Sequence, residues 1–372
     1  MLALPVAVLF PTLWAMSPSR LTAVLVSAGY FLGASRGLPQ GVANFYAADL
    51  WPGLLLWAVA SLSFAGVHAA LWKGQPEGTS PGEGRTGVAM AARYLAAAML
   101  IGLPPLGITG WAHPLTAAGV LFPGWGWWGL VAMTASLAMM TSRYWPAAAI
   151  VLGGFWLWSN ATWTSPDLPD GWKGVGLEQG ESLGRDGSLD YHRDLIATVR
   201  AAASAKTRFI VLPESALGFW TPTVAKLWSQ GLRGSELTVI AGAAVIDPSG
   251  YDNVLVAVSA DEARILYRER MPVPVSMWQP WRAWTGQVGG ARANLFDNPV
   301  VQSDGQNFAA LICYEQLLLW PVLQSMLHSP TALVAPGNGW WTAGTSIVAI
   351  QNASVMAWAK LFRLPMVTAF NR

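Results

Sequence analysis

Residues 309–315 read Ala309-Ala310-Leu311-Ile312-Cys313-Tyr314-Glu315 and contain the only cysteine of the chain. An apolar run typical of a buried strand ends here in a thiol, a phenol and a carboxylate, and the following residues are typical of a helix start. At such a junction a nucleophile lies at a chain bend, where backbone N–H groups can face a reacting oxygen. Taken alone, however, a single Cys in an apolar strand is more often a small core residue.

A similar run a hundred residues earlier favours a chemical interpretation. The stretch Phe209-Ile210-Val211-Leu212-Pro213-Glu214 ends in a carboxylate directly after a proline that fixes the backbone. A free thiol with a pKa of about 8.5 is mostly protonated at neutral pH, so a nearby base must take its proton as it attacks. We therefore predict Cys313 as nucleophile and Glu214 as general base, with Glu315 as a supporting group that positions the site. The alternative for Glu214 is an exposed residue that ends a strand.

These two motifs together resemble those of the nitrilase superfamily, in particular its membrane branch, which includes apolipoprotein N-acyltransferase. Within that branch, residues 271–281 and the layout of the whole chain resemble a group of plasmid conjugal-transfer proteins. The resemblance implies an α/β domain built as a four-layer α-β-β-α sandwich over residues 161–372, after a transmembrane domain over residues 1–160. It also implies an inner-membrane acyltransferase that works through a Cys313 thioester, with an acyl lipid as donor and an envelope or pilus protein as acceptor.

Two other functions remain open at this point. An amidase or other hydrolase of the same fold would let water resolve the thioester. A catalytically silent membrane scaffold of the transfer apparatus would need no chemistry at all. The scaffold is favoured by two departures from the family pattern: Glu269 stands where the family has its catalytic lysine, and Met277 where it has a second glutamate.

A cation must replace the missing lysine if the chain is an enzyme, because a carboxylate at Glu269 cannot stabilise an oxyanion. Arg268 and Arg270 flank that position and are permanently charged donors. Side chains alternate along a strand, so either arginine reaches the site only through a register shift or a bulge. We choose Arg270, which lies nearer the kinks expected at Pro272 and Pro274, and expect its removal to lower turnover while leaving the fold intact.

The composition indicates membrane spans. Apolar residues make up 53% of the 372 residues and charged residues only 11%, about half the usual share. Six apolar segments precede residue 160, roughly at 2–16, 21–32, 54–71, 94–108, 124–140 and 145–158. Residues 1–160 hold six Lys/Arg and three Asp/Glu, and residues 161–372 hold sixteen and seventeen, so neither part has the basic stripe of a nucleic-acid binder.

The charges of the loops predict the topology. The loops after the first, third and fifth segments hold five Lys/Arg, whereas those after the second and fourth hold only Arg36. The positive-inside rule then puts the N-terminus outside, and six crossings place everything after Trp158 in the periplasm of a bacterial inner-membrane protein.

A tryptophan-rich stretch follows the arginines. Trp278, Trp281 and Trp284 alternate with a single cation, Arg282, which suits a loop resting on a lipid interface. The alternative is a hydrophobic lid within the domain. Membrane lipids are thus predicted partners, and the absence of His/Cys/acidic spacings suited to zinc predicts no metal and no cofactor.

The second half reads as alternating strands and helices, which predicts the α/β class. The expected strands lie at 174–178, 208–212, 237–246, 253–259, 264–268, 309–313, 331–335 and 365–370, and the expected helices at 191–205, 224–232 and 346–362. His192 and His328 have no motif around them and are predicted to be surface residues. The sequence stops at Arg372, before the strand pair and final helix that the membrane branch usually has, so either the sequence or the protein is shortened there.

Overall fold

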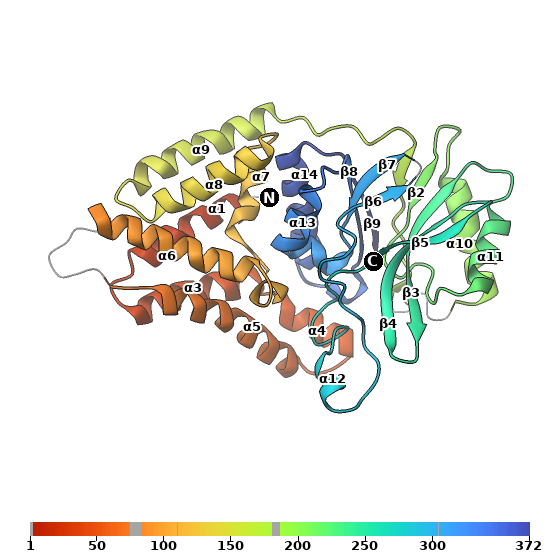
Figure 1. Cartoon of the computed structure of the whole chain (residues 1–372), viewed down its shortest axis with the longest axis horizontal. Helices are drawn as coiled ribbons and strands as arrows, with labels where there is room; N and C mark the ends of the chain where they lie inside the picture. Colours follow the sequence, from red (N-terminus) through yellow and green to blue (C-terminus); the bar gives the residue numbers. More distant parts are fainter. Residues whose placement is uncertain (1–2, 75–83, 110, 181–186, 304) are drawn as a thin grey trace. The chain divides into compact units, whose positions relative to one another are not determined.

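The structure, a computed structural model, describes residues 3–74, 84–109, 111–180, 187–303 and 305–372 (Figure 1). The chain forms two compact units. The first contains residues 1–165, 317–320 and 344–363, and the second contains residues 166–316, 321–343 and 364–372. Residues 75–83, the part of the predicted linker between Lys73 and Arg85, lie outside the described residues.

The second unit contains two β-sheets. Its five-stranded sheet has the order β1-β2-β3-β4-β5, and its four-stranded sheet has the order β6-β7-β8-β9. The strands of the first sheet are β1 (Trp172–Gly174), β2 (Phe209–Val211), β3 (Thr238–Asp247), β4 (Gly250–Val258) and β5 (Ala263–Arg268); those of the second are β6 (Val301–Ser303), β7 (Gln306–Ala310), β8 (Ala332–Asn338) and β9 (Met366–Asn371). Parallel pairs β1-β2-β3 and β7-β8-β9 bring several carboxyl ends to one edge of each sheet.

Apolar side chains from both sheets form one core. Phe209, Ile240 and Leu255 of the first sheet pack with Phe308 and Val334 of the second, and all five are buried. The other face of the five-stranded sheet is covered by α10 (Leu189–Ala202) and α11 (Pro222–Gly231) through a second core. A helix layer and two sheets packed face to face confirm the predicted α/β class and give three layers of the predicted sandwich.

The helices of this unit begin where their sequences provide caps. The Ser188 side chain accepts a hydrogen bond from the N–H of Tyr191 at the start of α10, and Thr221 does the same for Val224 at the start of α11. The prediction that His192 is a surface residue was wrong. Its ring is buried between α10 and α11, where Nδ1 accepts a hydrogen bond from Nε1 of Trp228 at 3.2 Å, whereas His328 is exposed as predicted.

The strand boundaries differ from those predicted by up to four residues, and β6 was not predicted. The first strand covers residues 172–174 instead of 174–178. The strand before the cysteine ends at Ala310, and Cys313 already opens a 3-10 helix, Cys313–Leu317, followed by α13 (Leu319–Met326). Beyond β1 the pairing continues as single hydrogen bonds, from the N–H of Val175 to the carbonyl oxygen of Val211 and from that of Leu177 to that of Phe370. At the cysteine the apolar run extends past the end of β7.

The first unit is helical. Its elements are α1 (Ala3–Val6), η1 (Ala7–Leu9), α2 (Phe10–Ala15), α3 (Arg20–Ala34), α4 (Leu38–Tyr46), α5 (Leu50–Leu71), α6 (Gly84–Gly102), η2 (Leu106–Thr109), η3 (Pro114–Ala117), α7 (Ala118–Leu121), α8 (Gly126–Met140), α9 (Trp145–Thr162) and α14 (Ile347–Phe362). By length and apolarity, α5 alone among the described helices could cross a membrane, or two spans exist if the bent pair α3 and α4 forms one. The six spans stay a prediction.

Helix α14 packs within this unit although it lies far along the chain. Gly119 of α7 faces it so closely that a Cβ there would lie 1.7 Å from the carbonyl oxygen of Ala357. Only glycine permits that approach of two helix backbones.

Candidate active site

The backbone at Cys313 is held in an uncommon conformation. The parallel pairing of β7 with β8 continues past the end of the strand through a hydrogen bond from the N–H of Leu311 to the carbonyl oxygen of Val334. Cys313 then adopts a φ of 39°, in the left-handed region that non-glycine residues rarely enter. Such strain persists only where the surroundings fix it, and it concentrates at functional sites.

Glu214 follows β2 and is fixed by β3. The N–H of Gly242 donates to the carbonyl oxygen of Pro213, and the N–H of Leu217 donates to that of Gly242. A Cβ at position 242 would lie 2.5 Å from the Cα of Glu214 and from the N of Ser215, so the glycine is what lets this loop pack on the strand. Ser215 has a φ of 61°, a second left-handed residue beside the site.

The thiol and the carboxyl predicted to react together lie together. The Cys313 thiol and the Glu214 carboxyl share a hydrogen bond, and their residues are only 4% and 5% exposed. Burial raises the pKa of both groups, and the charge of Glu214 raises the pKa of the thiol further. A thiol kept protonated beside a carboxyl of raised pKa is the arrangement that general-base activation requires.

A second carboxyl completes this group. The side-chain amide of Asn253, on β4, donates one hydrogen bond of 2.8 Å to Oε1 of Glu214 and another of 2.8 Å to Oε2 of Glu269. Glu269, just beyond β5, is fully buried, and burial and the charge of Glu214 raise its pKa well above the usual value. We call Glu214, Asn253, Glu269 and Cys313 the Cys313 cluster.

Glu315, two residues after Cys313, belongs to a second group of hydrogen-bonded side chains. Its carboxylate accepts hydrogen bonds from the N–H of Ile312 and the N–H of Arg270, both at 2.8 Å, and from the Tyr267 hydroxyl. These bonds tie the Cys313 bend to the segment after β5, which is the contact that a positioning role needs. We call Tyr267, Arg270 and Glu315 the Glu315 cluster.

The structure does not bring the guanidinium of Arg270 to the thiol, contrary to its predicted role. The side chain is fully buried in the Glu315 cluster, with Nε 3.5 Å from Oε1 of Glu315. Its nitrogens donate to the Tyr267 hydroxyl, the carbonyl oxygens of Pro321 and Ala310, and Gln324. Arg270 therefore compensates a buried carboxylate.

Arg268 points elsewhere too. It is part-exposed and pairs with Asp252, which also binds Nε of Arg292 at 2.7 Å. The β4–β5 pairing does contain the register shift that an inward arginine needed, at Leu255/Val256, but the side chain delivered to Glu214 is that of Glu269.

Sequence reasoning missed three residues of this region. Asn253 was read only as the start of an apolar strand, and its polarity within that strand was the available signal. Tyr267 was read as an ordinary strand residue. Asn338, at the end of β8, has its carbonyl oxygen 3.9 Å from the Cys313 sulfur and its side chain 3.0 Å from that of Asn371. Both asparagines end adjacent parallel strands, β8 and β9, whereas Glu214 and Cys313 follow strands of different sheets, β2 and β7.

The sequence as a whole matches the family model of carbon–nitrogen hydrolases over residues 33–360, and a Cys–Glu site lies inside that range. The chain belongs to the carbon–nitrogen hydrolase family. Two relatives align over 370 residues, the whole of this chain: the conjugal transfer protein TraB of Agrobacterium fabrum, 74% identical over 88% of its length, and the probable conjugal transfer protein TraB of Sinorhizobium fredii, 60% identical over 93% of its length.

Solved structures of carbon–nitrogen hydrolases are more distant. That of a carbon–nitrogen hydrolase from Helicobacter pylori is 13% identical, with a TM-score of 0.38 over 54% of this chain and 73% of its own. Because the chain belongs to this family, it contains an enzyme domain of the nitrilase-superfamily type. The match to the Helicobacter pylori structure adds nothing about activity.

The tryptophan-rich stretch, residues 278–284, which we call the tryptophan loop, is largely exposed. Trp281 and Trp284 lie on a short helix, α12 (Trp281–Trp284), with Trp284 84% exposed, and Trp278 is half-buried. Val288 and Phe296, which follow this loop in the chain, are also exposed. This exposure favours the lipid-facing loop for Trp284, and both the loop and the hydrophobic lid stay predictions.

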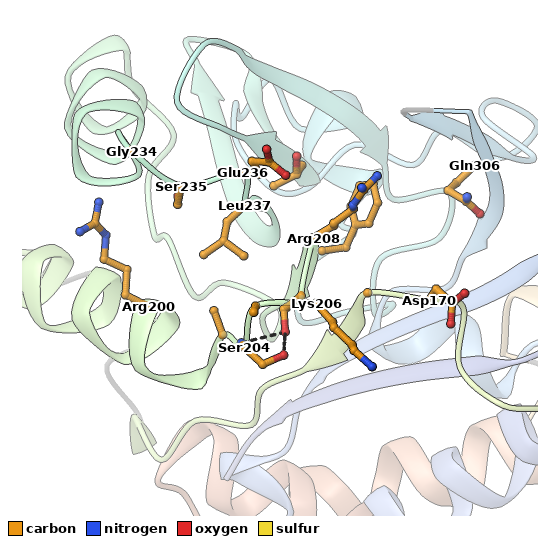
Figure 2. A pocket seen from close by; sticks show the side chains of 16 residues that line it. Asp170, Arg200, Ser204, Lys206, Arg208, Gly234, Ser235, Glu236, Leu237 and Gln306 are labelled. Carbon is orange, nitrogen blue, oxygen red and sulfur yellow. Dashed lines mark hydrogen bonds between the residues drawn. The ribbon is translucent and has the colours of Figure 1, made fainter.

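A groove in this unit lies away from the cysteine. It is open, about 1260 Å³, and is bounded by the carboxyl end of α10 and the residues before β2 and β3 (Figure 2). Glu214 follows the other end of β2. Arg200, Lys206 and Arg208 line the groove together with Asp170 and Glu236, so its charge is mixed. Its side chains are mostly exposed, and we do not assign it a role. Within the described residues, no cluster of three His, Cys, Asp or Glu side chains suits a metal ion.

Proposed function

We propose that this chain is a membrane acyltransferase of a plasmid conjugal-transfer system that works through a thioester on Cys313. The observation that carries the proposal is the buried Cys313–Glu214 hydrogen bond at the ends of β7 and β2. The names of its two relatives support the role in conjugation. An acyl lipid is the proposed donor, and an amine on an envelope or pilus protein is the proposed acceptor.

The proposed reaction has two steps. Glu214 takes the thiol proton as the sulfur attacks the ester carbonyl carbon, the C–O bond breaks, and the leaving alkoxide receives that proton. An amine then attacks the thioester, the C–S bond breaks, and the proton lost by the amine returns through Glu214 to the thiolate. Both steps pass through a tetrahedral oxyanion, which needs a hydrogen-bond donor.

Exposed apolar side chains in each unit support a membrane location. Leu54, Leu55, Val59 and Leu62 are exposed on α5, and Ile150, Val151 and Leu157 on α9. Soluble monomers rarely expose apolar patches of this kind, so lipid is the natural cover. In the second unit, the exposed aromatics of the tryptophan loop suit a lipid interface directly after Glu269 and Arg270 in the chain.

A hydrolase is the second candidate, favoured by the family to which the chain belongs. In that case water would replace the amine in the second step. A silent scaffold is the third candidate, favoured by the replacement of the family lysine by Glu269.

Intact-mass spectrometry of the purified full chain separates these functions. After incubation with bacterial phospholipid, we expect a mass increase of one acyl chain that is lost in Cys313→Ala and released by an added amine. Release by water alone supports the hydrolase. Complete absence of an adduct, with Cys313 still alkylated by iodoacetamide, favours the scaffold.

The lipid contact of the tryptophan loop can be tested separately. Trp284→Ala should lower acylation by a lipid donor several-fold while leaving acylation by a water-soluble ester unchanged, since only the first requires the interface. Trp228→Phe, a change in the α10–α11 core, should affect both donors equally. Equal acylation by lipid in Trp284→Ala and wild type would remove the loop from the proposal.

The predicted topology is tested by reporter fusions. A reporter active only in the periplasm should be active when fused near Gly171 and silent when fused in the 74–84 linker. The reverse pattern would place the second unit in the cytoplasm, and the lipid donor would then have to come from the inner leaflet.

A further inference from the structure

The buried charges of the second unit do not balance at Cys313. Among the described residues, the buried Glu315 is paired with Arg270, and the buried Asp252 with Arg268 and Arg292. Glu214 and Glu269 are buried as well, yet neither forms an ion pair in the described part of the chain. Two carboxyls bridged by one amide in such surroundings cannot both be ionised, so one of them keeps a proton.

The contacts of the two carboxyls indicate which one keeps it. The side-chain amide of Asn253 donates one hydrogen bond to each carboxyl and so does not distinguish them. Glu214 has the Cys313 thiol as a further partner, whereas Oε1 of Glu269 is buried without a hydrogen-bond partner among the described residues. A bare carboxylate oxygen in that position would be costly, but the O–H of a neutral acid is a donor that awaits an acceptor.

The groups around Glu269 point the same way. Glu214 follows β2, and Glu315 lies in the 3-10 helix after Cys313; both are acidic and raise its pKa, with burial as the largest cause. Asn253 on β4 is neutral, and the cationic head of Arg270 is engaged with Glu315. Protonating Glu269 leaves Glu214 free to ionise and act as base.

We propose that Glu269 is a neutral carboxylic acid whose O–H donates a hydrogen bond to the acyl carbonyl oxygen as negative charge develops there during attack by Cys313. The inference rests on the proposed function and assigns the position of the family lysine a different chemistry. A carboxylic acid kept neutral by an apolar site can serve as an oxyanion donor. Glu269 keeps its proton through both steps, and only Glu214 exchanges one.

The test compares two reactions of Cys313 in the purified full chain. Alkylation by iodoacetamide forms no oxyanion, whereas acylation by a p-nitrophenyl ester does. Glu269→Met removes the donor at similar size, and we expect acylation to fall about a hundredfold or more while alkylation stays within about threefold of wild type. Glu269→Gln retains an N–H donor, so acylation should stay within about tenfold and lose the decline at high pH that ionisation of Glu269 causes in wild type.

Glu236→Gln, an exposed carboxyl in the groove of Figure 2, is the matched control and should change neither rate. Acylation of Glu269→Met at the wild-type rate would overturn the proposal. A parallel fall of acylation and alkylation would also overturn it, because Glu269 would then only position the thiol.

Infrared spectroscopy keeps the two proposals distinguishable. If wild type is alkylated but not acylated by any ester, the proposed function fails. The difference spectrum between wild type and Glu269→Gln then decides the protonation: a protonated-carboxyl band at neutral pH upholds the neutral acid, and its absence overturns it.

Discussion

The two buried polar clusters of the second unit use similar residues with opposite results. In the Glu315 cluster, one carboxylate receives two backbone N–H groups, a hydroxyl and an arginine, and every donor nitrogen of the Arg270 side chain has an acceptor. In the Cys313 cluster, two carboxyls share one amide, and one oxygen of Glu269 is without a partner among the described residues.

The difference separates architecture from chemistry. A fully satisfied network fixes the relative position of the segments that carry it. A buried group left without a partner or a compensating charge raises the free energy of the folded state, and such groups are concentrated where a ligand or a reacting atom supplies the missing contact. Glu315 belongs to the satisfied network, and Glu269 to the group with a missing contact. The sequence does not reveal this difference, since both are acidic residues.

The largest expected effect comes from breaking the satisfied cluster. Arg270→Met leaves Glu315 buried without its cation and should lower the free energy of unfolding by about 3–5 kcal/mol. This revises the expectation that the fold survives the loss of Arg270. Chemical denaturation of the full chain measures it, with Arg268→Met as control, since Asp252 keeps Arg292 and the loss there should stay under about 1 kcal/mol. Equal losses in the two variants would contradict the distinction.

A substitution in the Cys313 cluster should lower the rate of acylation without lowering the stability of the fold. Glu214→Gln should lower acylation of Cys313 by about a thousandfold, because no base remains to take the thiol proton. Its melting temperature should equal or exceed that of wild type, since a buried acid becomes a neutral amide. Glu315→Gln should instead lower the melting temperature and change the acylation rate little. A large loss of stability in Glu214→Gln would contradict the distinction between the two clusters.

The glycine beneath Glu214 provides a geometric test of the same cluster. Gly242→Ala places a methyl group within 2.5 Å of the Glu214 backbone, so the loop must move. We expect acylation to fall by about 10- to 100-fold and stability by about 1–3 kcal/mol. Gly154→Ala on α9, where a Cβ meets open space, is the control. Unchanged acylation in Gly242→Ala would mean that the position of Glu214 does not limit the reaction.

The most gradual effect is a dependence of stability on pH. The pKa of Glu269 is raised in the folded protein by burial, so as pH rises above about 4.5 the unfolded chain releases this proton before the folded one does. Wild type should therefore lose stability relative to Glu269→Gln, by at most about 1.4 kcal/mol per pH unit, until the folded group ionises too. Unfolding of both proteins across pH 4 to 8 measures the difference, and a difference that does not change with pH would contradict the raised pKa of Glu269.

The parts of the site that depend on neighbouring residues could be predicted from the sequence. The strand that ends before Glu214 and the apolar run before Cys313 predicted two groups at carboxyl ends of parallel strands, and the structure places them in contact. The class of the fold followed from the same alternation. These features depend on periodicity and on chain bends, which neighbouring residues determine.

The cation was misplaced because its position depends on distant partners. Counting along the strand could not reveal the register shift opposite Leu255/Val256, nor that Glu315 would hold Arg270 through its side chain and its backbone N–H. The burial of His192 has a similar origin, since Trp228 lies on another helix. Asn253 gave a signal, a polar residue in an apolar strand, that only a partner could explain.

Gly119 and the helix it contacts bear on how the protein can be divided. Helix α14 belongs to the first unit, so the chain passes between the units near residues 165, 316, 320, 343 and 363. A fragment from residue 166 onward would carry α14 with its buried face uncovered, and one ending at residue 165 would lack the helix that Gly119 receives. Expression of either fragment after a single cut at residue 165 should therefore give insoluble protein. We expect the two units to fold, and to be exchanged between relatives, only together.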